Sequence, residues 1–355
     1  MKRRKRLSSV LSALLVCAML ITSSGVSALA SSVEPVPAGE TVAEMQLEQG
    51  ERKIAFNDDW KFSLDDPVGA QRADFDDSGW ETVTLPHDWS IYQDFELFGT
   101  AGQTAGFLDG GTGWYRKDLV IGQDLQDKRI TLDFDGAHLV TTVYVNGENI
   151  GQHFNGYTSF SFDITDYLKR DGSTNVIAVK VENRTPSARW YSGSGIYRNV
   201  YLTVTNDIHV DRYGTFVTTP TLEEDIKQNF ANVHIQTEVV NQTGKQQDIQ
   251  LFTQILDMDG NEVGTAETSQ PAAAESAAFE QDIQVNDPQL WSTENPYLYT
   301  VVSHVLVDGE EVDTYETTTG FRYFNFDSEE GFSLNGEYMK LHGVCMHHDL
   351  SLIHI

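Results

Sequence analysis

The chain has few of the groups that cross-link or anchor a protein. It contains 2 cysteines among 355 residues. Cys17 lies in an N-terminal apolar run, so Cys345 alone remains if that segment is removed. One cysteine cannot form an internal disulfide, and packed cores must then hold the fold together. The apolar run, Val10–Ile21, is shorter than the ~20 residues of an ordinary membrane-spanning helix.

Positive charge is scarce and is concentrated at the N-terminus. Lys2-Arg3-Arg4-Lys5-Arg6 precede the apolar run, and Ala28-Leu29-Ala30 follow it. A basic segment, a short apolar segment and an A-x-A site predict a secretory signal peptide over residues 1–30 that is cleaved from the mature protein. No second apolar run follows, so we expect a secreted or cell-surface protein with no membrane contact after cleavage.

The remaining chain is strongly acidic. The leader removes five of 24 basic residues and none of the 53 acidic ones, so the mature net charge is 19 − 53 = −34. Such a surface repels nucleic acids and anionic lipids, which excludes both as general partners. It favours a soluble protein with a neutral or cationic partner.

Helical periodicity is missing from residues 51–205, where short alternating runs are separated by turn residues. Residues 31–50 come before them and are rich in Pro, Glu, Ser and Gly, which predicts a linker. In "RITLDFDGAHLVTTVYVNGENIG", two alternating runs end at Asn146-Gly147, a strong hairpin signal. We therefore predict an all-β jelly roll over residues 51–205.

A second all-β region covers residues 206–319. Four strand-like stretches, among them "ANVHIQTEVVN" and "AAFEQDIQV", are bounded by Gly-containing turns. About 110 residues with this rhythm predict an immunoglobulin-like β-sandwich, although the cysteine pair of antibody domains is absent.

The sequence texture changes again in residues 320–355. A hairpin is predicted at Asn335-Gly336, and an apolar strand at Met339–Val344 that ends in His347-His348-Asp349. A strand with titratable residues at its C-terminal end is typical of the active-site face of a TIM (β/α)8 barrel. A barrel needs about 250 residues, so we expect only its first strand here.

Four motifs carry a family resemblance, and they occur in order along the mature chain. They are "LPHDWSI" (85–91), "GTGWYRKDL" (111–119), "RWYSGSGIYRNVYL" (189–202) and "LNGEYMKLHGVCMHH" (334–348). The chain resembles glycoside hydrolase family 2, whose layout is a sugar-binding jelly roll, an immunoglobulin-like domain and a catalytic barrel. The resemblance implies a retaining O-glycosyl hydrolase with two catalytic glutamates on later barrel strands.

Both glutamates are expected beyond Ile355. The one Asn-Glu dipeptide, Asn261-Glu262, lies in a predicted turn of the second β region. We therefore expect an N-terminal fragment that is inactive alone, and residues 351–355 ("SLIHI") depart from the family pattern as a truncation or assembly artefact would.

The motifs favour the β-galactosidase branch, which hydrolyses terminal β-galactosides of oligosaccharides or glycans, in a bacterium. β-Glucuronidase and β-mannosidase activity remain alternatives, as does a secreted carbohydrate-binding protein without catalysis. No cofactor is evident in the chain, although Mg²⁺ or Na⁺ is compatible with the full-length enzyme. A homo-oligomer is also compatible with the full-length enzyme.

The resemblance assigns roles near the chain's end. His347 would contact the sugar and stabilise the transition state, because an imidazole at a strand end can donate a hydrogen bond that strengthens as charge develops. His348 and Asp349 would orient it or bind substrate. A metal site that also recruits His342 is disfavoured, since residues five apart on a strand face opposite sides and zinc ligands must converge.

Three further substrate-binding candidates lie in the jelly roll. Asp88 stands where β-galactosidases place an Asn; it can accept hydroxyl hydrogen bonds but cannot donate them, and it could equally be a turn residue ahead of a core Trp89. Arg189 stands where the family has an Asp, which leaves the sugar open and keeps β-glucuronidase possible. Trp190 could stack on a sugar ring or pack in the core.

Overall fold

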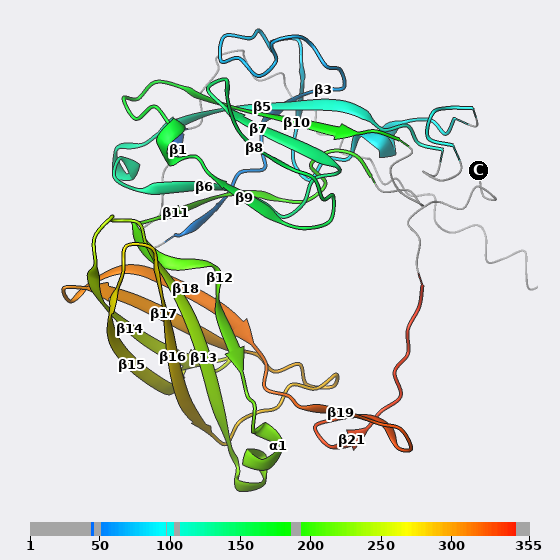
Figure 1. Ribbon diagram of the computed structural model, residues 1–355. Coiled ribbons are helices and arrows are strands. Elements are labelled where there is room, and N and C mark those ends of the chain that lie inside the picture. The colour runs from blue at the N-terminus through cyan, green and yellow to red at the C-terminus, as the bar shows by residue number, and fades with distance from the viewer. Residues whose placement is uncertain (1–43, 46–50, 97, 103–106, 186–192, 346–355) are drawn as a thin grey trace, which may run out of the picture. The chain divides into compact units, whose positions relative to one another are not determined.

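The computed structural model describes residues 44–45, 51–96, 98–102, 107–185 and 193–345 (Figure 1). The expected signal peptide lies outside these residues. Within the range predicted as a linker, β1 (Glu44–Met45) pairs in parallel with Val120 and Ile121. No helix in the described ranges has the length and apolar character needed to cross a membrane.

The first sandwich consists of two facing sheets. Its larger sheet has the order β4-β3-β5-β10-β7-β8, with β1 on β5. These strands are β3 (Trp60–Ser63), β4 (Glu81–Val83), β5 (Gly111–Ile121), β7 (Val140–Val145), β8 (Glu148–His153) and β10 (Asn175–Asn183). The smaller sheet has the order β2-β11-β6-β9, formed by β2 (Lys53–Ala55), β6 (Arg129–Phe134), β9 (Phe160–Asp163) and β11 (Val200–Thr205).

The alternating sequence pattern explains how these sheets face each other. Ile130, Leu132 and Phe134 of β6 point into the core and are fully buried, while the residues between them face outward because side chains alternate along a strand. Short 3-10 helices lie in the described connections: η1 (Trp89–Tyr92), η3 (Gln123–Leu125) and η4 (Thr165–Tyr167). The all-β prediction for this region is confirmed.

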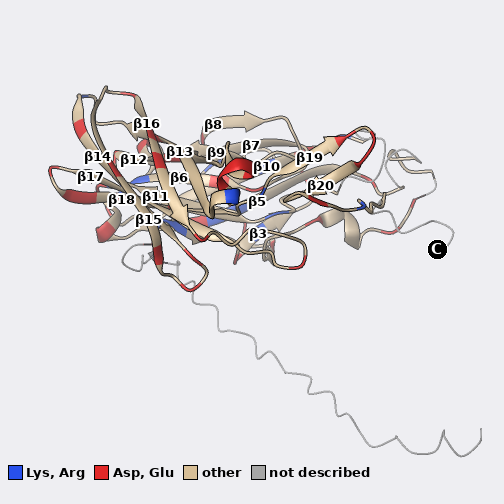
Figure 2. Ribbon diagram, turned by 90° about the horizontal axis from the view of Figure 1, so that it is seen from below, with Lys and Arg blue, Asp and Glu red and all other residues tan. Residues whose placement is uncertain are grey.

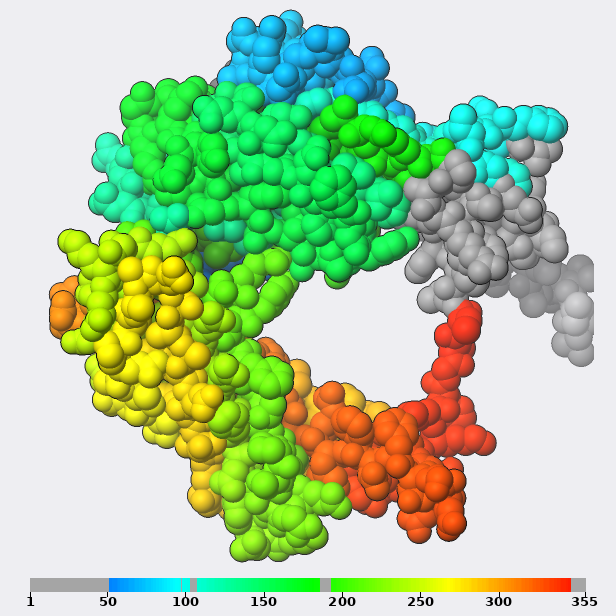
Figure 3. Space-filling view, in the orientation of Figure 1, coloured from blue at the N-terminus to red at the C-terminus, as the bar shows by residue number. Residues whose placement is uncertain are grey.

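The connection between β3 and β4 covers the outer face of the larger sheet. Arg116 of β5 is 2% exposed and forms an ion pair with Asp77 of this connection, with Nε 2.6 Å from Oδ2. Trp114 packs beside it with Phe75 and Trp80. The space-filling view shows this segment as blue atoms over the first sandwich (Figure 3). A buried arginine of this kind needs its carboxylate partner, since an unpaired buried charge is strongly unfavourable.

The second sandwich has longer and more regular strands. One sheet has the order β12-β13-β16 and the other β15-β14-β17-β18. The strands are β12 (Ile208–Thr218), β13 (Phe230–Asn241), β14 (Gln247–Leu256), β15 (Glu262–Ala272), β16 (Ser276–Asn286), β17 (Tyr299–Val307) and β18 (Glu310–Thr319). The helices α1 (Leu222–Asp225) and η5 (Ile226–Gln228) connect β12 to β13. This is the two-sheet architecture predicted for an immunoglobulin-like domain.

Three hairpins share one turn geometry. Asn146-Gly147, Asp308-Gly309 and Asn335-Gly336 all have positive φ at both residues, at 53° and 90°, 52° and 82°, and 53° and 81° respectively. This conformation matches the right-handed twist of the flanking strands, and Asn, Asp and Gly adopt it most readily. The hairpins predicted at Asn146-Gly147 and Asn335-Gly336 are confirmed.

The C-terminal described segment forms a small separate sheet, and it corrects one prediction. β19 (Phe324–Asp327), β20 (Gly331–Leu334) and β21 (Glu337–Tyr338) pair in that order. Residues 339–345 follow without β pairing, so the strand expected at Met339–Val344 is wrong for this structure. Val344 is 91% exposed and Cys345 is exposed too. A barrel strand is buried by neighbouring strands and helices, and none covers this segment among the described residues.

Acidic side chains lie along the strands and turns of both sandwiches, and basic ones are few (Figure 2). Each sandwich nevertheless has its own apolar core. The first contains Trp60 and Phe134, and the second contains Phe279 and Phe321, all completely buried. The acidic surface therefore surrounds cores that are packed independently.

Candidate functional site

Asp88 lies at a junction of loops at one end of the first sandwich. It caps η1, where its Oδ1 accepts a hydrogen bond from the Ser90 backbone N–H at 2.9 Å. The same oxygen accepts the Ser194 N–H at 2.9 Å from the loop that precedes β11. One carboxylate oxygen thus joins two segments that are 106 residues apart in the sequence. The interpretation of Asp88 as a structural turn residue is correct for this atom.

The residues beneath Asp88 form a rigid base. Trp89 is 3% exposed, and its ring stacks on Phe62 with centroids 5.8 Å apart. The Ser90 hydroxyl donates to Ser194 Oγ at 2.6 Å, and the Asn183 side chain donates to the same oxygen at 2.8 Å. Buried, satisfied polar groups of this kind fix loop geometry. Asp88 is therefore held in one position by both apolar and polar contacts.

Two buried histidines flank Asp88. His87 Nδ1 lies 2.9 Å from the Tyr115 hydroxyl. His138 exchanges backbone hydrogen bonds with Gly195, at 2.9 and 3.1 Å. Burial lowers the pKa of both imidazoles, and the negative charge of Asp88 opposes that shift at each of them. Both rings are consequently neutral near pH 7.

Exposed aromatic rings continue outward from each histidine. Tyr92 is 77% exposed and stacks on His87 at 6.1 Å. Tyr157 is 63% exposed and meets His138 edge-on at 5.4 Å. An aromatic face suits the C–H patches of a sugar ring, and a carboxylate accepts hydrogen bonds from hydroxyl groups. This arrangement can therefore hold a polyhydroxylated ring without reacting with it.

Sequence reasoning missed His87, His138, Tyr92 and Tyr157. Tyr157 had a usable signal, because it follows the Asn155-Gly156 turn pair, where a large aromatic side chain is difficult to bury. His87 is the sequence neighbour of Asp88 in the "LPHDWSI" motif, whereas His138 had no such signal. The proximity of His138 to Asp88 depends on the contact between the 135–139 loop and Gly195, which joins distant parts of the chain.

The other predicted site residues lie outside the described residues. These are Arg189, Trp190, His347, His348 and Asp349. Their predicted contacts with a sugar stay predictions. His342 lies in the exposed stretch after β21. Among the residues that the structure describes, no three His, Cys, Asp or Glu side chains are grouped so as to hold a metal ion.

Two family models match the chain in succession. The sugar-binding domain of glycosyl hydrolases family 2 matches residues 54–206. A second model, described as glycosyl hydrolases family 2, matches residues 208–322. Together they cover both sandwiches and the link to β19.

Curated relatives carry two activity names. The β-galactosidase BoGH2A of Bacteroides ovatus is 42% identical over 84% of this chain and 35% of its own length. A putative β-glucuronidase of Formosa agariphila is 36% identical over 82% of this chain and 27% of its own length. The chain therefore spans about a third of the length of the curated relatives that it matches.

Solved structures agree with this match. A glycosyl hydrolase family 2 member from Bacteroides cellulosilyticus superposes with a TM-score of 0.79 at 38% identity, over 84% of this chain and 39% of that one. A β-glucuronidase from Bacteroides uniformis gives a TM-score of 0.73 at 34% identity, over 83% and 35%. On matching domain models, sequence and fold, this chain belongs to family 2 of the glycosyl hydrolases.

Proposed function

We propose that this chain is the sugar-binding N-terminal part of a secreted, retaining β-galactosidase. The enzyme would remove terminal β-galactosides from oligosaccharides or glycans. The observation that carries this proposal is the Asp88 carboxylate, fixed by two backbone N–H groups and flanked by the exposed rings of Tyr92 and Tyr157. A hydroxyl-rich ring satisfies that arrangement.

The charge of Asp88 also favours one sugar over another. The relatives include enzymes named β-galactosidase and β-glucuronidase. A glucuronide carries a carboxylate, which a second fixed carboxylate would repel unless a cation lies between them. A galactoside is neutral and offers only hydroxyl groups to Asp88. β-Glucuronidase is the second candidate, supported by those relatives and by Arg189 in the sequence.

We place the two catalytic glutamates outside this chain. Retention requires two carboxyl groups roughly 5–5.5 Å apart, one as nucleophile and one as acid/base. Glu262, of the Asn-Glu pair, instead begins β15 and accepts a hydrogen bond from Gln254 at 2.7 Å. Asn261 donates to the Asp257 carboxylate at 3.1 Å. Both residues stabilise a turn, and His347 would act only in the full enzyme.

The test uses the full reading frame and this chain side by side. We expect the complete enzyme to have its highest kcat/KM on nitrophenyl β-galactoside, compared with the β-glucuronide and the β-mannoside, while residues 31–355 alone show no turnover. Preference for the glucuronide would reject the galactosidase assignment. Secretion is checked separately by whether the exported protein begins near residue 31.

A matched variant tests the role of Asp88 in selectivity. Asp88→Asn keeps an acceptor oxygen for the Ser90 and Ser194 N–H groups and removes the charge. We expect it to lower the ratio of kcat/KM for the galactoside to kcat/KM for the glucuronide by about tenfold. A tenfold change corresponds to roughly 1.4 kcal/mol in binding free energy. An unchanged ratio would show that Asp88 does not face the sugar.

A further inference from the structure

A second concave surface lies away from Asp88, on the outer face of the smaller sheet of the first sandwich. It encloses a cavity of about 370 Å³. Its floor comes from β2, β6, β9 and β11, and its walls come from β12 and from Tyr315 of β18. We call this surface the β12 groove. Its volume is at the lower end of the ~300–1,000 Å³ of small-molecule sites.

Strand register makes the floor of the groove entirely polar at its centre. Thr203 of β11 pairs with Lys53 of β2 on one side and with Thr131 of β6 on the other. Thr131 in turn pairs with Asp163 of β9. These four side chains form a row across the sheet, since paired residues lie on the same face. The apolar residues between them face the core on the other side.

A β-bulge builds the wall of the groove. The pairing of β12 with β13 shifts register between Val210 and Thr215. Tyr213 lies in this bulge with φ of 56° and is 68% exposed. Gly214 is required beside it, because a Cβ there would come within 2.9 Å of the Asp211 carbonyl oxygen. Bulges redirect side chains, and a bulky residue with positive φ is strained and marks a position worth a functional explanation.

The bulge places Tyr213 and Arg212 beside the floor. The Tyr213 hydroxyl lies 3.4 Å from Ser159 Oγ, near the start of β9. Arg212 Nε pairs with Asp133 Oδ1 at 2.9 Å, and its guanidinium lies 4.6 Å from the centre of the Tyr213 ring. The ring therefore forms an aromatic surface next to charged groups that are already fixed by their own ion pairs.

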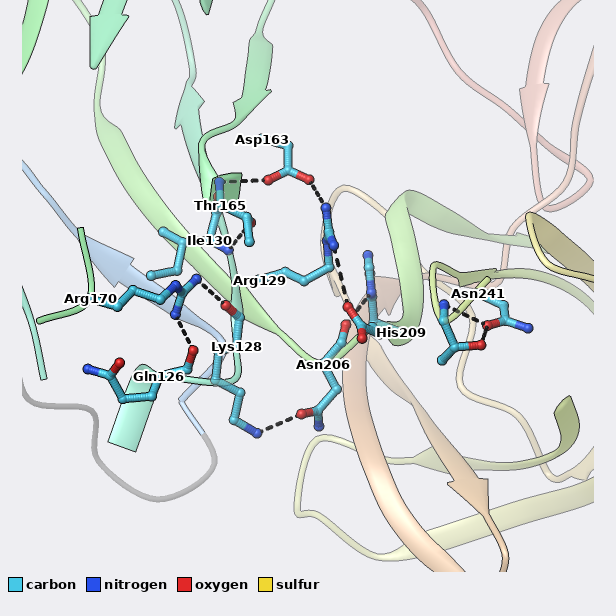
Figure 4. Close-up of polar contacts among 12 residues, drawn as sticks. Gln126, Lys128, Arg129, Ile130, Asp163, Thr165, Arg170, Asn206, His209 and Asn241 are labelled. Carbon is cyan, nitrogen blue, oxygen red and sulfur yellow. Dashed lines mark hydrogen bonds and ion pairs between the residues drawn. The ribbon is translucent and has the colours of Figure 1, made fainter. Parts of the chain in front are cut away.

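Most of the charges in the groove are paired. Figure 4 shows Arg129 reaching to Asp163, with Asn206 and His209 on its other side. The Arg129–Asp163 contact is 2.5 Å. Arg52 pairs with Asp313 at 3.4 Å. These pairs offer both donors and acceptors in fixed positions, which is what recognition of several hydroxyl groups needs.

Two charged residues of the lining, Lys53 and Asp211, form no ion pair with any described residue. Lys53 is exposed and lies over the Tyr201 ring, with Nζ 3.7 Å from the ring centre. A chain with 53 acidic and 24 basic residues thus presents in this groove a lysine that no ion pair holds. An anionic group on a ligand would meet an attractive charge here, whereas the general surface would repel it.

We propose that the β12 groove is a second, non-catalytic carbohydrate-binding site that takes an acidic saccharide. The Tyr213 ring stacks on the sugar face, the fixed Arg–Asp pairs bind hydroxyl groups, and Lys53 binds the negative group. That group is a uronate carboxylate or a sulfate ester, which share the chemistry that Lys53 recognises. The proposal does not depend on which glycoside the enzyme hydrolyses, because no residue of the groove belongs to the Asp88 site.

Ligand-observed saturation-transfer NMR on this chain tests the proposal with glucuronate, galactose 6-sulfate and galactose. We expect at least one of the two acids to bind with a Kd on the order of 1 mM, and galactose to bind more weakly. Binding of glucuronate alone identifies a carboxylate ligand, and binding of galactose 6-sulfate alone identifies a sulfate ester. Binding of none of the three overturns the proposal.

Two variants locate the signal in the groove. Lys53→Ala should weaken binding of the acids about tenfold, a loss of one charge-assisted contact, and leave galactose unchanged. Tyr213→Gly should weaken all three sugars while leaving the melting temperature equal or higher, because it relieves the positive φ. Tyr213→Phe should retain binding, and Lys227→Ala, an exposed lysine of the second sandwich, should change nothing.

Three results would contradict the proposal. The first is equal competition by acetate or inorganic sulfate, which would make the groove a simple anion site. The second is loss of the signal in Asp88→Asn with retention in Tyr213→Gly, which would place the sugar at the other site. The third is stronger displacement by poly-glutamate than by any saccharide, which would indicate an acidic protein partner.

Discussion

The two sandwiches share one layered plan but use their connections differently. In the first, long connections turn back on the sheets and bury polar groups such as His138 and Asn183. In the second, strands of 9 to 12 residues are joined by turns such as Asp308-Gly309. The Asp88 site lies in the first kind of connection. Binding residues commonly lie in such loops, which the rigid sheets hold in place.

The β12 groove is lined by one of the register shifts of the second sandwich, which also shifts register at Ile255–Leu256 and at Val305–Leu306. Its bulge at 211–214 is the place where β12 loses register with β13. Elsewhere β13 and β16 pair without interruption from Phe230 to Val240. A bulge in a sheet can therefore carry function in the same way as a loop, because it redirects side chains out of the regular pattern.

The largest expected effect is on a regular core. Phe279→Ala removes a fully buried ring from the second sandwich, and we expect the free energy of unfolding of that sandwich to fall by about 3–5 kcal/mol. Sugar binding at the Asp88 site should be unchanged below the melting temperature. Urea unfolding followed by tryptophan fluorescence and circular dichroism measures this. Phe216→Ala, on the exposed side of β12, is the control; equal losses in both variants would refute the distinction.

A second effect concerns the seam between the two sandwiches. Burial raises the pKa of Asp313 from 3.8 to about 6, although Arg52 nearby opposes the shift. The folded protein therefore keeps this proton to higher pH than the unfolded chain does. The contribution of this carboxyl group to the free energy of unfolding falls by roughly 3 kcal/mol as pH rises from about 4 to about 6. It is constant above that range.

Asp313→Asn isolates that contribution. In the unmodified chain, loss of the Asp313 proton lowers the free energy of unfolding as pH rises from 4 to 7. We expect Asp313→Asn to lack that fall. Urea titration of both proteins at the two pH values measures the difference. The exposed Asp259→Asn variant should follow the unmodified chain. Parallel pH curves for all three proteins would mean that the Asp313 carboxyl is not protonated on folding.

The smallest expected effect is on the stability of the junction at Asp88. Asp88→Ala leaves the N–H groups of Ser90 and Ser194 without their acceptor, and we expect a loss of about 1–3 kcal/mol. Asp88→Asn should restore most of it, because an amide oxygen also accepts hydrogen bonds. Thermal unfolding of the two variants provides the measurement. If both lose the same stability, the charge rather than the hydrogen bonds holds the junction together.

Much of the fold could be predicted because it is encoded locally. Alternation at Ile130, Leu132 and Phe134 predicts a strand with one buried face, and the structure confirms it. The turn pair Asn146-Gly147 predicts a hairpin for a reason that lies in its own two residues. Trp89, expected in the core after Asp88, is 3% exposed.

Other features could not be predicted from local patterns. The apolar run Met339–Val344 predicts a strand, yet a strand exists only where partners supply a ladder of hydrogen bonds. Here the Met339 N–H donates to the Phe332 carbonyl at 3.0 Å, and the described residues form no ladder beyond it. The polar stretch of β15 gives little strand signal, although it pairs with β14 along its length. In both cases the neighbouring elements, rather than the residues themselves, set the outcome.

The sequence by itself determined the all-β class, the division into two sandwiches and the hairpin turns, because these follow from side-chain alternation and from the φ preferences of single residues. Only the tertiary structure decided that His138 lies near Asp88, and that Lys53 and Tyr213 face one cavity. Those contacts join segments far apart along the chain. Strand register and loop packing bring them together, and no local pattern encodes either.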